Sequence, residues 1–412
     1  MINLRFAPVR QQVSTERVND VIATTREGLR ALLLNARVRP GMRVAIALPS
    51  RGIPCMPQVV RVVIEELRAL NAQPFLVPAM GSHGAGTAEG QREVLEGYGL
   101  DEKMTGVPII SSLDTVQIGE AENGMPVFAD QHAATADGII AINRIKEHTA
   151  FKARWESGLL KILAVGLGKP RGAAEIHNWG VADAMPAAAR VVLARLPVIA
   201  GIGIVENGHH QAARIAVIPA ERIESDEPAL LDLARRFTPR IPSEFEPIDL
   251  LIVQEMGKDI SGTGMDLNVI GMWRRTGGPI APLINVIAVL DLTPNSHGNA
   301  IGVGHSDLIA QRLRDKIDIA ATYTNCLTAH NLAGAKIPIT LSTDREVIEA
   351  GLTGVAPERA RAVLIRNTLA LDLLWVSEAL LPAIAKTATL EQIGEARALD
   401  FDAHGALIVP EP

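Results

Sequence analysis

The sequence contains few cysteines and few aromatic residues, and both shortages exclude classes of protein. Its 412 residues include two cysteines, Cys55 and Cys326, so neither a disulfide framework nor a CxxC metal site can form. Aromatic residues make up 3% of the chain, which argues against a nucleic-acid partner, because single strands are held largely by stacking on aromatic rings. The net charge is -6, with no basic stripe to hold a phosphate backbone. A small-molecule partner is therefore expected.

Long apolar runs are also missing. No segment approaches the ~18 consecutive apolar residues that a membrane span needs, and the first residues lack the apolar segment of a signal peptide. Two cysteines in unrelated contexts fit a reducing compartment. We therefore expect a cytoplasmic protein without a membrane partner.

The first half of the chain alternates apolar strands with helical patterns. Strands are predicted at residues 43–48, 74–77 and 138–143, and helices at 57–70 and 87–98. This alternation is typical of an α/β fold with a mostly parallel sheet. Residues 198–205 and 213–218 flank an Asn-Gly pair, which predicts a β-hairpin.

A proline-rich segment separates this half from the next. Residues 237–247 contain three prolines, which interrupt helix and strand alike. Strand and helix patterns then resume, with strands predicted at residues 250–254, 285–290 and 337–341, helices at 307–314 and 369–385, and a hairpin around His404-Gly405. We therefore predict an N-terminal α/β domain (1–243), a C-terminal α/β domain (244–388) and a tail (389–412) that packs back on the N-terminal domain. An active-site cleft is expected between the domains.

Three predicted strands of the first domain are followed by polar side chains. Arg51 comes after the first strand, Ser82 and His83 lie in a glycine-rich loop after the second, and His148 comes soon after the third. Open α/β sheets bind ligands at the carboxyl ends of their strands. An arginine can hold a carboxylate, and an imidazole can move protons near neutral pH. The residues indicate a binding or catalytic site at this edge.

A lysine and a further histidine, Lys161 and His177, follow these residues in the chain. Lys161 lies in an apolar helical run with no acidic residue three or four positions away, so we expect its amine to have a lowered pKa and to be nucleophilic. His177 follows sixteen residues later and could ligate a metal. The intervening Gly166-Leu-Gly168 resembles part of a dinucleotide fingerprint but lacks the third glycine in register, so NAD binding is not expected.

Taken together, these residues resemble the nickel-pincer-nucleotide-dependent lactate racemase family. The resemblance follows the order of the chain through both domains, and its specific motifs lie mostly between residues 47 and 180. Its most specific element is the pair of strand-end histidines followed by a lysine and a histidine sixteen residues apart. This set comprises Arg51, Gly81-Ser82-His83-Gly84, His148, Lys161 and His177.

The resemblance implies a role for each residue. Lys161 matches the lysine that forms a thioamide link to the cofactor, pyridinium-3-thioamide-5-thiocarboxylic acid mononucleotide, with Ser82 and Arg51 beside it. His177 matches the histidine that completes the coordination of nickel. His83 and His148 match two general bases on opposite sides of the substrate. The family mechanism removes hydride from Cα of a 2-hydroxy acid to the cofactor and returns it to the other face, and cofactor-maturation proteins are implied as partners.

The sequence departs from the lactate enzymes in three places, one of which is a longer segment between His148 and Lys161. The family carries an acidic residue and a threonine before the arginine, whereas this chain reads Leu48-Pro49-Ser50-Arg51. In the second domain the lactate enzymes offer tyrosine, glutamine and lysine, whereas this chain has a loop that contains Lys258 and Ser261. We expect these two residues to contact substrate together with Arg51. The expected substrate is a sugar acid or a dicarboxylic hydroxy acid rather than lactate.

Two alternatives stay open at this point. In one, His83, His148 and His177 are the ligands of a metal-dependent hydrolase. In the other, the chain is a non-catalytic protein that binds nucleotide or nickel. The sequence also leaves open which hydroxy acid is used, whether the chain forms a homo-oligomer, and what His297, His305 and Asn325 do.

Overall fold

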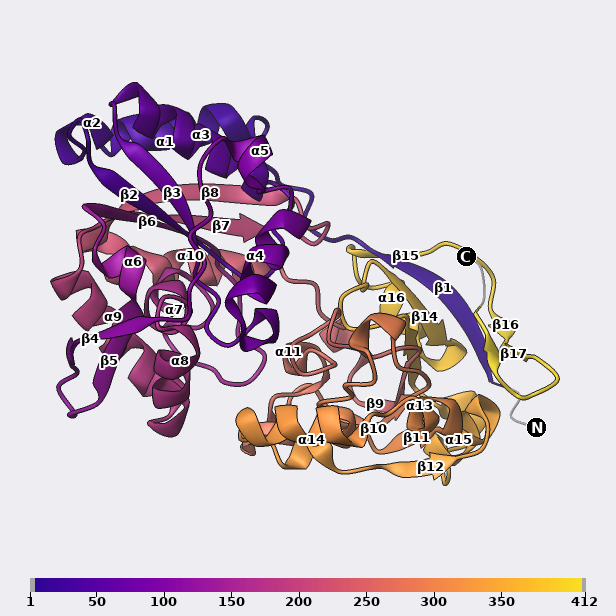
Figure 1. The fold of residues 1–412 in the computed structure, drawn as a ribbon. Coiled ribbons are helices and arrows are strands. Elements are labelled where there is room, and N and C mark those ends of the chain that lie inside the picture. Colours follow the sequence, from indigo (N-terminus) through magenta and orange to yellow (C-terminus); the bar gives the residue numbers. More distant parts are fainter. Residues whose placement is uncertain (1–3, 410–412) are drawn as a thin grey trace. The chain divides into compact units, whose positions relative to one another are not determined.

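Two α/β units make up the structure, a computed structural model that describes residues 4–409 (Figure 1). The first unit contains residues 14–148 and 152–238. The second contains the described parts of residues 1–13 and 239–412, with the short segment 149–151. The fold class agrees with the prediction, and each unit is described by itself below.

The first unit is built on a five-stranded sheet with the strand order β3-β2-β6-β7-β8. The strands β3, β2, β6 and β7 are parallel, and β8 pairs antiparallel with β7 as the predicted hairpin. Its strands are β2 (Arg43–Leu48), β3 (Gln73–Pro78), β6 (Gly138–Arg144), β7 (Val198–Glu206) and β8 (Ala212–Pro219), and a separate hairpin joins β4 (Thr115–Glu120) to β5 (Pro126–Asp130).

Helices cover both faces of this sheet. Alternate residues of the strands point to opposite sides, so that Ala45 and Ala47 enter one hydrophobic core while Val44 and Ile46 enter the other. The second core contains residues of α1 and α3, and the first contains residues of α7, α9 and α10. The helices of the unit are α1 (Val21–Ala31), α2 (Leu34–Arg37), α3 (Met56–Ala69), α4 (Ala88–Gly97), α5 (Glu102–Thr105), α6 (Gln131–Ala134), α7 (Leu159–Lys161), α8 (Lys169–Asn178), α9 (Val181–Arg195) and α10 (Ile223–Phe237).

The second unit contains a nine-stranded mixed sheet with the order β12-β11-β10-β9-β13-β14-β1-β15, and β16 also pairs with β1. The strands from β12 to β13 are parallel, and those from β14 onward are antiparallel. They are β1 (Arg5–Gln11), β9 (Ile248–Val253), β10 (Ile284–Val289), β11 (Leu308–Ala310), β12 (Ile339–Leu341), β13 (Ala362–Ile365), β14 (Leu373–Ser377), β15 (Leu390–Gln392) and β16 (Arg397–Ala398).

Short helices and one hairpin complete the second unit. The hairpin of β17 (Asp400–Phe401) and β18 (Leu407–Ile408) forms around His404-Gly405, as predicted. The helices are α11 (Leu267–Ile270), α12 (Trp273–Thr276), α13 (Gln311–Asp315), α14 (Ile319–Thr328), α15 (Asp344–Gly351) and α16 (Leu381–Ile384).

The division of the chain differs from the predicted one at both ends. The first thirteen residues group with the second unit, because β1 pairs with β14, β15 and β16. The tail also stays within that unit: its hairpin lies against α15, where the Leu407 N–H donates to Asp344 Oδ2 at 2.8 Å. A boundary drawn from proline content alone does not detect a terminal strand that crosses into the other sheet.

Two predicted helices of the second unit are only partly correct, because each contains a strand. Residues 369–385 contain the buried strand β14 and the short helix α16, and residues 307–314 contain β11 before α13. A short, continuous apolar run such as Leu373-Leu-Trp-Val does not distinguish a fully buried strand from a buried helix, and here sheet pairing decides.

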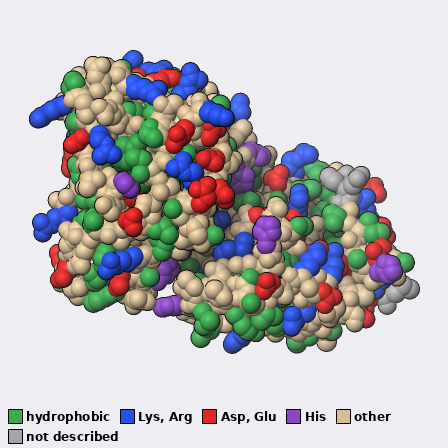
Figure 2. Space-filling view, in the orientation of Figure 1, with side chains coloured by type: hydrophobic (Ala, Val, Ile, Leu, Met, Phe, Trp, Pro, Cys, Tyr) green, Lys and Arg blue, Asp and Glu red, His purple; other side chains and the backbone are tan. Residues whose placement is uncertain are grey.

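The surface agrees with the slightly acidic composition. Figure 2 shows acidic and basic side chains mixed over the face that it draws, without a continuous basic area there. Among residues 4–409, no helix combines the length and the apolar character that crossing a membrane requires.

Candidate functional site

The carboxyl ends of three adjacent strands meet at one edge of the first sheet. β2 lies between β3 and β6, and all three are parallel, with Leu48 opposite Pro78 and Ala47 opposite Ala141. The chain passes from β2 to β3 on one side and returns to β6 on the other. The gap between β2 and β6 is therefore a topological switch point, where open α/β sheets bind ligands. The segments with Arg51, His83 and His148 all leave the sheet at this edge.

His83 is oriented by the segment that follows β2. Its Nδ1 is hydrogen-bonded to Ser50 Oγ, which joins the ends of two neighbouring strands. Tyr98 in turn donates its hydroxyl to the Ser50 carbonyl at 2.7 Å, and burial raises the pKa of that phenol. His83 and the adjacent Ser82 are both exposed. The hydrogen bond to Ser50 thus fixes the orientation of this imidazole at the strand ends.

Basic side chains gather at the same edge. Arg144 at the end of β6 forms an ion pair with Glu206 at 2.7 Å and donates to the Gly52 carbonyl. Arg51 is exposed, yet the pKa of its guanidinium is lowered, first because surrounding protein atoms reduce its hydration and next because Arg144 lies nearby. Burial raises the pKa of Glu206, which Arg144 and Lys146 oppose. The edge is thus suited to an anionic ligand.

Lys161 lies close to this basic group. It is the last residue of α7 and is half-buried, and its pKa is lowered to about 7, mainly by desolvation and further by Arg51 and Lys146. Among the described residues, its ammonium has neither an ion-pair partner nor a hydrogen-bond acceptor. A lysine in this state is partly uncharged at neutral pH and therefore nucleophilic.

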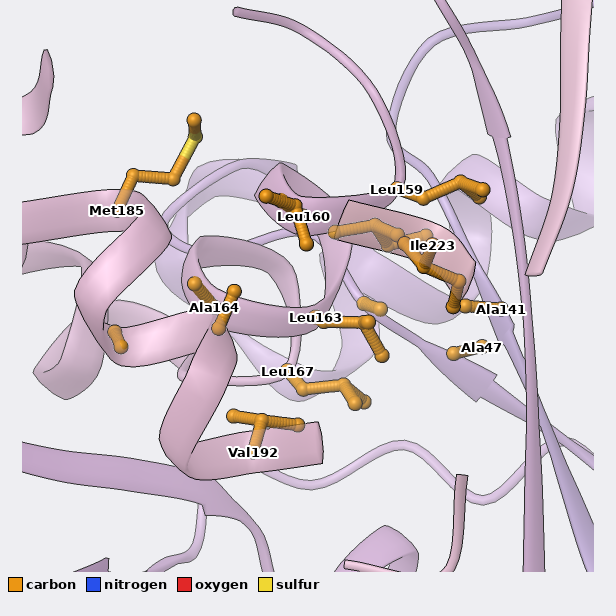
Figure 3. Packing of buried hydrophobic residues seen from close by; sticks show 14 of the residues in the cluster. Ala47, Ala141, Leu159, Leu160, Leu163, Ala164, Leu167, Met185, Val192 and Ile223 are labelled. Carbon is orange, nitrogen blue, oxygen red and sulfur yellow. The ribbon is translucent and has the colours of Figure 1, made fainter. Parts of the chain in front are cut away.

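A wide π-helical turn, η2 (Ile162–Gly166), follows Lys161 directly. The Leu167 N–H donates to the Ile162 carbonyl at 2.9 Å, five residues back. Figure 3 shows Leu163 and Ala164 of this turn in the same core as Ala47 and Ala141 of the sheet. Such turns inside helices are frequent at functional sites.

Gly166, the last residue of this turn, serves close packing. A Cβ at Gly166 would lie 2.6 Å from the Ala79 carbonyl oxygen, so only glycine fits there. The Gly81 N–H donates to the Gly166 carbonyl at 3.1 Å. The π-helical turn is thereby held against the loop that leads to His83.

A fully buried polar network reinforces the same loop. Gln91 of α4 donates to the carbonyls of Gly81 and His83 at 2.8 and 3.2 Å. Lys169, the first residue of α8, donates to Gln91 Oε1 at 3.1 Å and to the Pro78 carbonyl at 2.5 Å. Its Nζ also lies 3.3 Å from Asp130 Oδ2, and both side chains are 0% exposed. Burial lowers the pKa of Lys169, and Asp130 opposes this. The network ties α4, α8 and the loop before His83 together.

His148 lies in a loop whose two ends pair with each other. The residues on either side, Lys146 and Ser157, form an isolated antiparallel bridge. Inside the loop, buried Glu156 accepts the His148 N–H at 2.6 Å through Oε2 and pairs with Arg235 at 2.7 Å through Oε1. The half-buried His148 is therefore held through its backbone from α10.

The other predicted residues are placed as follows. His177 is half-buried in the last turn of α8. Lys258 and Ser261 belong to the second unit, where Lys258 donates to the Gly262 carbonyl at 3.0 Å and buried Ser261 lies 3.2 Å from the Thr263 hydroxyl. In the part of the chain that the structure describes, no group of three or more His, Cys, Asp or Glu side chains is placed to hold a metal ion. His83, His148 and His177 are thus not grouped as shared metal ligands among these residues.

Comparison with known proteins agrees with the architecture of this edge. Residues 7–185 match the family model described as the lactate racemase N-terminal domain. This part of the chain therefore resembles the N-terminal domain of lactate racemases. The match contains the strand ends, Lys161 and His177, so it covers the motifs on which the resemblance in sequence was based. A search of curated proteins finds no match.

A solved structure extends the likeness to both units. The lactate racemase apoprotein from Thermoanaerobacterium thermosaccharolyticum superposes with a TM-score of 0.51, covering 89% of this chain and 99% of that one. The sequences are 10% identical, so this likeness shows that the fold is shared. The resemblance to the lactate racemase family and the α/β fold class are thereby confirmed.

Sequence reasoning missed the buried polar residues that hold the loops and helices of the site in place. Gln91, Lys169 and Glu227 are buried polar side chains on α4, α8 and α10. A polar residue at a core position of an amphipathic helix is the signal that could have identified them. Glu227, for example, falls in the buried stripe of α10 with Ile223 and Leu231.

Proposed function

We propose that the protein is a racemase or epimerase that inverts the hydroxyl-bearing Cα of a 2-hydroxy acid with the nickel-pincer nucleotide. The family assignment of residues 7–185 supports an isomerase of this kind. The observation that carries the proposal is the Lys161 amine, with its pKa lowered to about 7, close to Arg51 at the sheet edge where His83 lies. An isolated nucleophilic amine is what a covalently attached cofactor requires.

The residues present fit this cofactor. Lys161 would form the covalent link, with Ser82 and Arg51 beside it, and His177 would supply one nitrogen to nickel. The absence of a larger donor group among the described residues agrees with a metal whose remaining donors belong to the cofactor. When bound, the cofactor supplies a reversible acceptor for the hydride of Cα.

Side chains of the protein would transfer the hydroxyl proton of the substrate and bind its carboxylate. Because Ser50 engages Nδ1 of His83, Nε2 is the nitrogen that we propose exchanges the hydroxyl proton of one enantiomer. His148 would serve the other enantiomer, whose hydroxyl group points to the opposite side. Arg51 would hold the substrate carboxylate.

The substrate is proposed to be larger than lactate. Lys258 and Ser261 take the place of the substrate residues of the lactate enzymes, and Lys258 can bind a second carboxylate or a hydroxyl group. Ser261 is buried against Thr263, so of the two Lys258 is the stronger candidate for direct contact. A sugar acid or dicarboxylic hydroxy acid fits this chemistry.

Intact-mass measurement and chiral chromatography test the proposal together. Protein made in a host that contains the cofactor-maturation proteins should carry an adduct of nucleotide size and retain nickel, and Lys161→Ala should abolish the adduct. Candidate acids should undergo stereoinversion. A protein with the adduct but no activity toward any 2-hydroxy acid would indicate a non-catalytic binding protein. An unmodified protein without nickel from the same host would disprove the proposed cofactor.

A further inference from the structure

The helix that ends in Lys161 begins without a cap of its own. The first N–H groups of a helix have no partner inside the helix and are usually satisfied by the side chain of the preceding residue. Here that residue is Gly158, which has no side chain. The Gly158 carbonyl is fixed from the other side, where Asn143 Nδ2 donates to it at 2.7 Å.

A carboxylate from another helix supplies the missing cap. Glu227 lies one turn into α10 and is 1% exposed. The Leu160 N–H donates to its Oε2 at 2.9 Å, and the Leu159 N–H donates to the same carboxylate. Ile223, one turn earlier on the same face, packs in the core with Leu159, so apolar contacts hold α10 beside α7 (Figure 3).

The absence of a side chain at residue 158 is part of the same arrangement. A Cβ at Gly158 would lie 2.4 Å from Glu227 Oε1, so any other residue would displace the carboxylate. The glycine therefore serves to admit Glu227 to the start of α7.

Burial of Glu227 is costly, which argues that it has a specific role. Desolvation raises the pKa of its carboxyl to about 7, and only the two backbone N–H groups oppose this. No cation is among the groups that affect it, so Glu227 is not half of an ion pair. It is also not among the charges that perturb Lys161, which are Arg51 beyond β2 and Lys146 beyond β6. Glu227 instead meets the backbone N–H groups of Leu159 and Leu160, directly before Lys161, so the route from Glu227 to Lys161 runs through the backbone.

We propose that Glu227 is a positioning residue for Lys161: by capping α7 it holds the lysine side chain in its desolvated place, where the amine is reactive. This role rests on the proposed function of Lys161 as the point of cofactor attachment. It requires no metal or cofactor to be present, because the cap acts on the chain before attachment.

The test measures the reactivity of Lys161 in the protein without cofactor. The protein is treated with trinitrobenzenesulfonate over a range of pH, and labelling of the peptide that contains Lys161 is followed by mass spectrometry. In the wild-type protein the labelling midpoint is expected near pH 7. In Glu227→Gln, an NH2 group replaces one carboxylate oxygen and cannot accept a hydrogen bond from the Leu159 or Leu160 N–H. The start of α7 should therefore loosen and let water reach Lys161. The midpoint should rise by about one pH unit or more, and labelling at pH 7 should fall about fivefold or more.

Matched controls separate positioning from general damage. Glu224→Gln removes a charge from the same helix at its interaction with Arg190 and should leave the midpoint unchanged. Gly158→Ala displaces the Glu227 carboxylate from the opposite side and should raise the midpoint as Glu227→Gln does. If either folded variant keeps the wild-type midpoint, the positioning role is wrong. Should Glu227→Gln not fold, Gly158→Ala decides.

The outcome is distinguishable from failure of the proposed function. The midpoint could shift as expected in a protein that never acquires a nucleotide adduct in the competent host. This outcome would support Glu227 as the cap of a reactive lysine and disprove the proposed cofactor. An adduct on Lys161 with an unchanged midpoint in Glu227→Gln would support the cofactor and overturn the role of Glu227.

Discussion

Ser50 Oγ and His83 Nδ1 are hydrogen-bonded to each other across the ends of β2 and β3. The two residues are 33 positions apart in the chain, and parallel pairing of the strands brings them together. Because the partner of Nδ1 determines how the imidazole is oriented, Ser50 controls which ring nitrogen can meet a substrate.

Replacement of Ser50 by alanine should therefore lower catalysis. Loss of one orienting hydrogen bond is expected to reduce kcat for the hydroxy acid by about tenfold, equivalent to ~1.4 kcal/mol, and to alter its pH profile. Ser50→Thr keeps the hydroxyl group and should retain most of the activity. Steady-state kinetics of both variants over a range of pH would check this, and an unchanged kcat in Ser50→Ala would contradict it.

The lowered pKa of Lys161 predicts a pH-dependent gain of stability on its removal. The amine has a pKa of about 7 in the folded protein and an ordinary value of 10.5 when unfolded, so the unfolded state binds more protons between these values. Stability of the wild-type protein should thus rise with pH through this window. Lys161→Met lacks this dependence, so it should raise Tm most below pH 7 and progressively less as the pH approaches 10.5.

Thermal unfolding of the cofactor-free protein at several pH values measures this difference. Lys103→Met removes an exposed lysine of the same unit and should show no such trend. A pH-independent difference between Lys161→Met and the wild-type protein would mean that the amine titrates normally.

The sequence was sufficient to predict the edge of the first sheet but not what holds it. The strands at 43–48 and 138–143 were predicted because continuous apolar runs between helical patterns are typical of parallel strands, and they agree with β2 and β6. The strand ends then follow from parallel pairing. The Lys169 network could not be predicted, because Gln91 and Asp130 meet Lys169 only through tertiary packing.

The second unit was predicted less well for a related reason. β1 lies more than 360 residues from its partner β14, and nothing local in Arg5–Gln11 indicates this pairing. The apolar residues of β14 were taken for a helix, since burial on both faces removes the alternation by which a half-exposed strand is recognised. Long-range pairing, rather than local propensity, determined both segments.

The Asp130–Lys169 pair should be important for stability. Both side chains are fully buried, so Asp130→Asn would leave a buried ammonium without its counter-charge. We expect a loss of roughly 3–5 kcal/mol in the free energy of unfolding, measured with denaturant. The double variant Asp130→Asn with Lys169→Met should be less destabilised than Asp130→Asn alone, because the uncompensated charge is gone. By comparison, Glu221→Gln at the exposed pair with Arg37 should cost about 0–1 kcal/mol. If the loss in the double variant equals the sum of the losses in Asp130→Asn and in Lys169→Met, the two groups do not interact.

Glu156 should matter to catalysis through His148. Its two oxygens join the His148 N–H to Arg235, so the carboxylate fixes where the loop carries the imidazole. Glu156→Gln keeps the shape but weakens both contacts, and kcat/KM should fall by about tenfold, since hydrogen bonds to a charged group are the stronger kind. The fall should be equal for the two epimers of the substrate, because the equilibrium constant between them fixes the ratio of their kcat/KM values.

Glu120→Gln, at an exposed position of β4, serves as the control and should behave as the wild-type protein. If Glu156→Gln retains full kcat/KM while remaining folded, the loop is held by other contacts and His148 does not depend on this carboxylate.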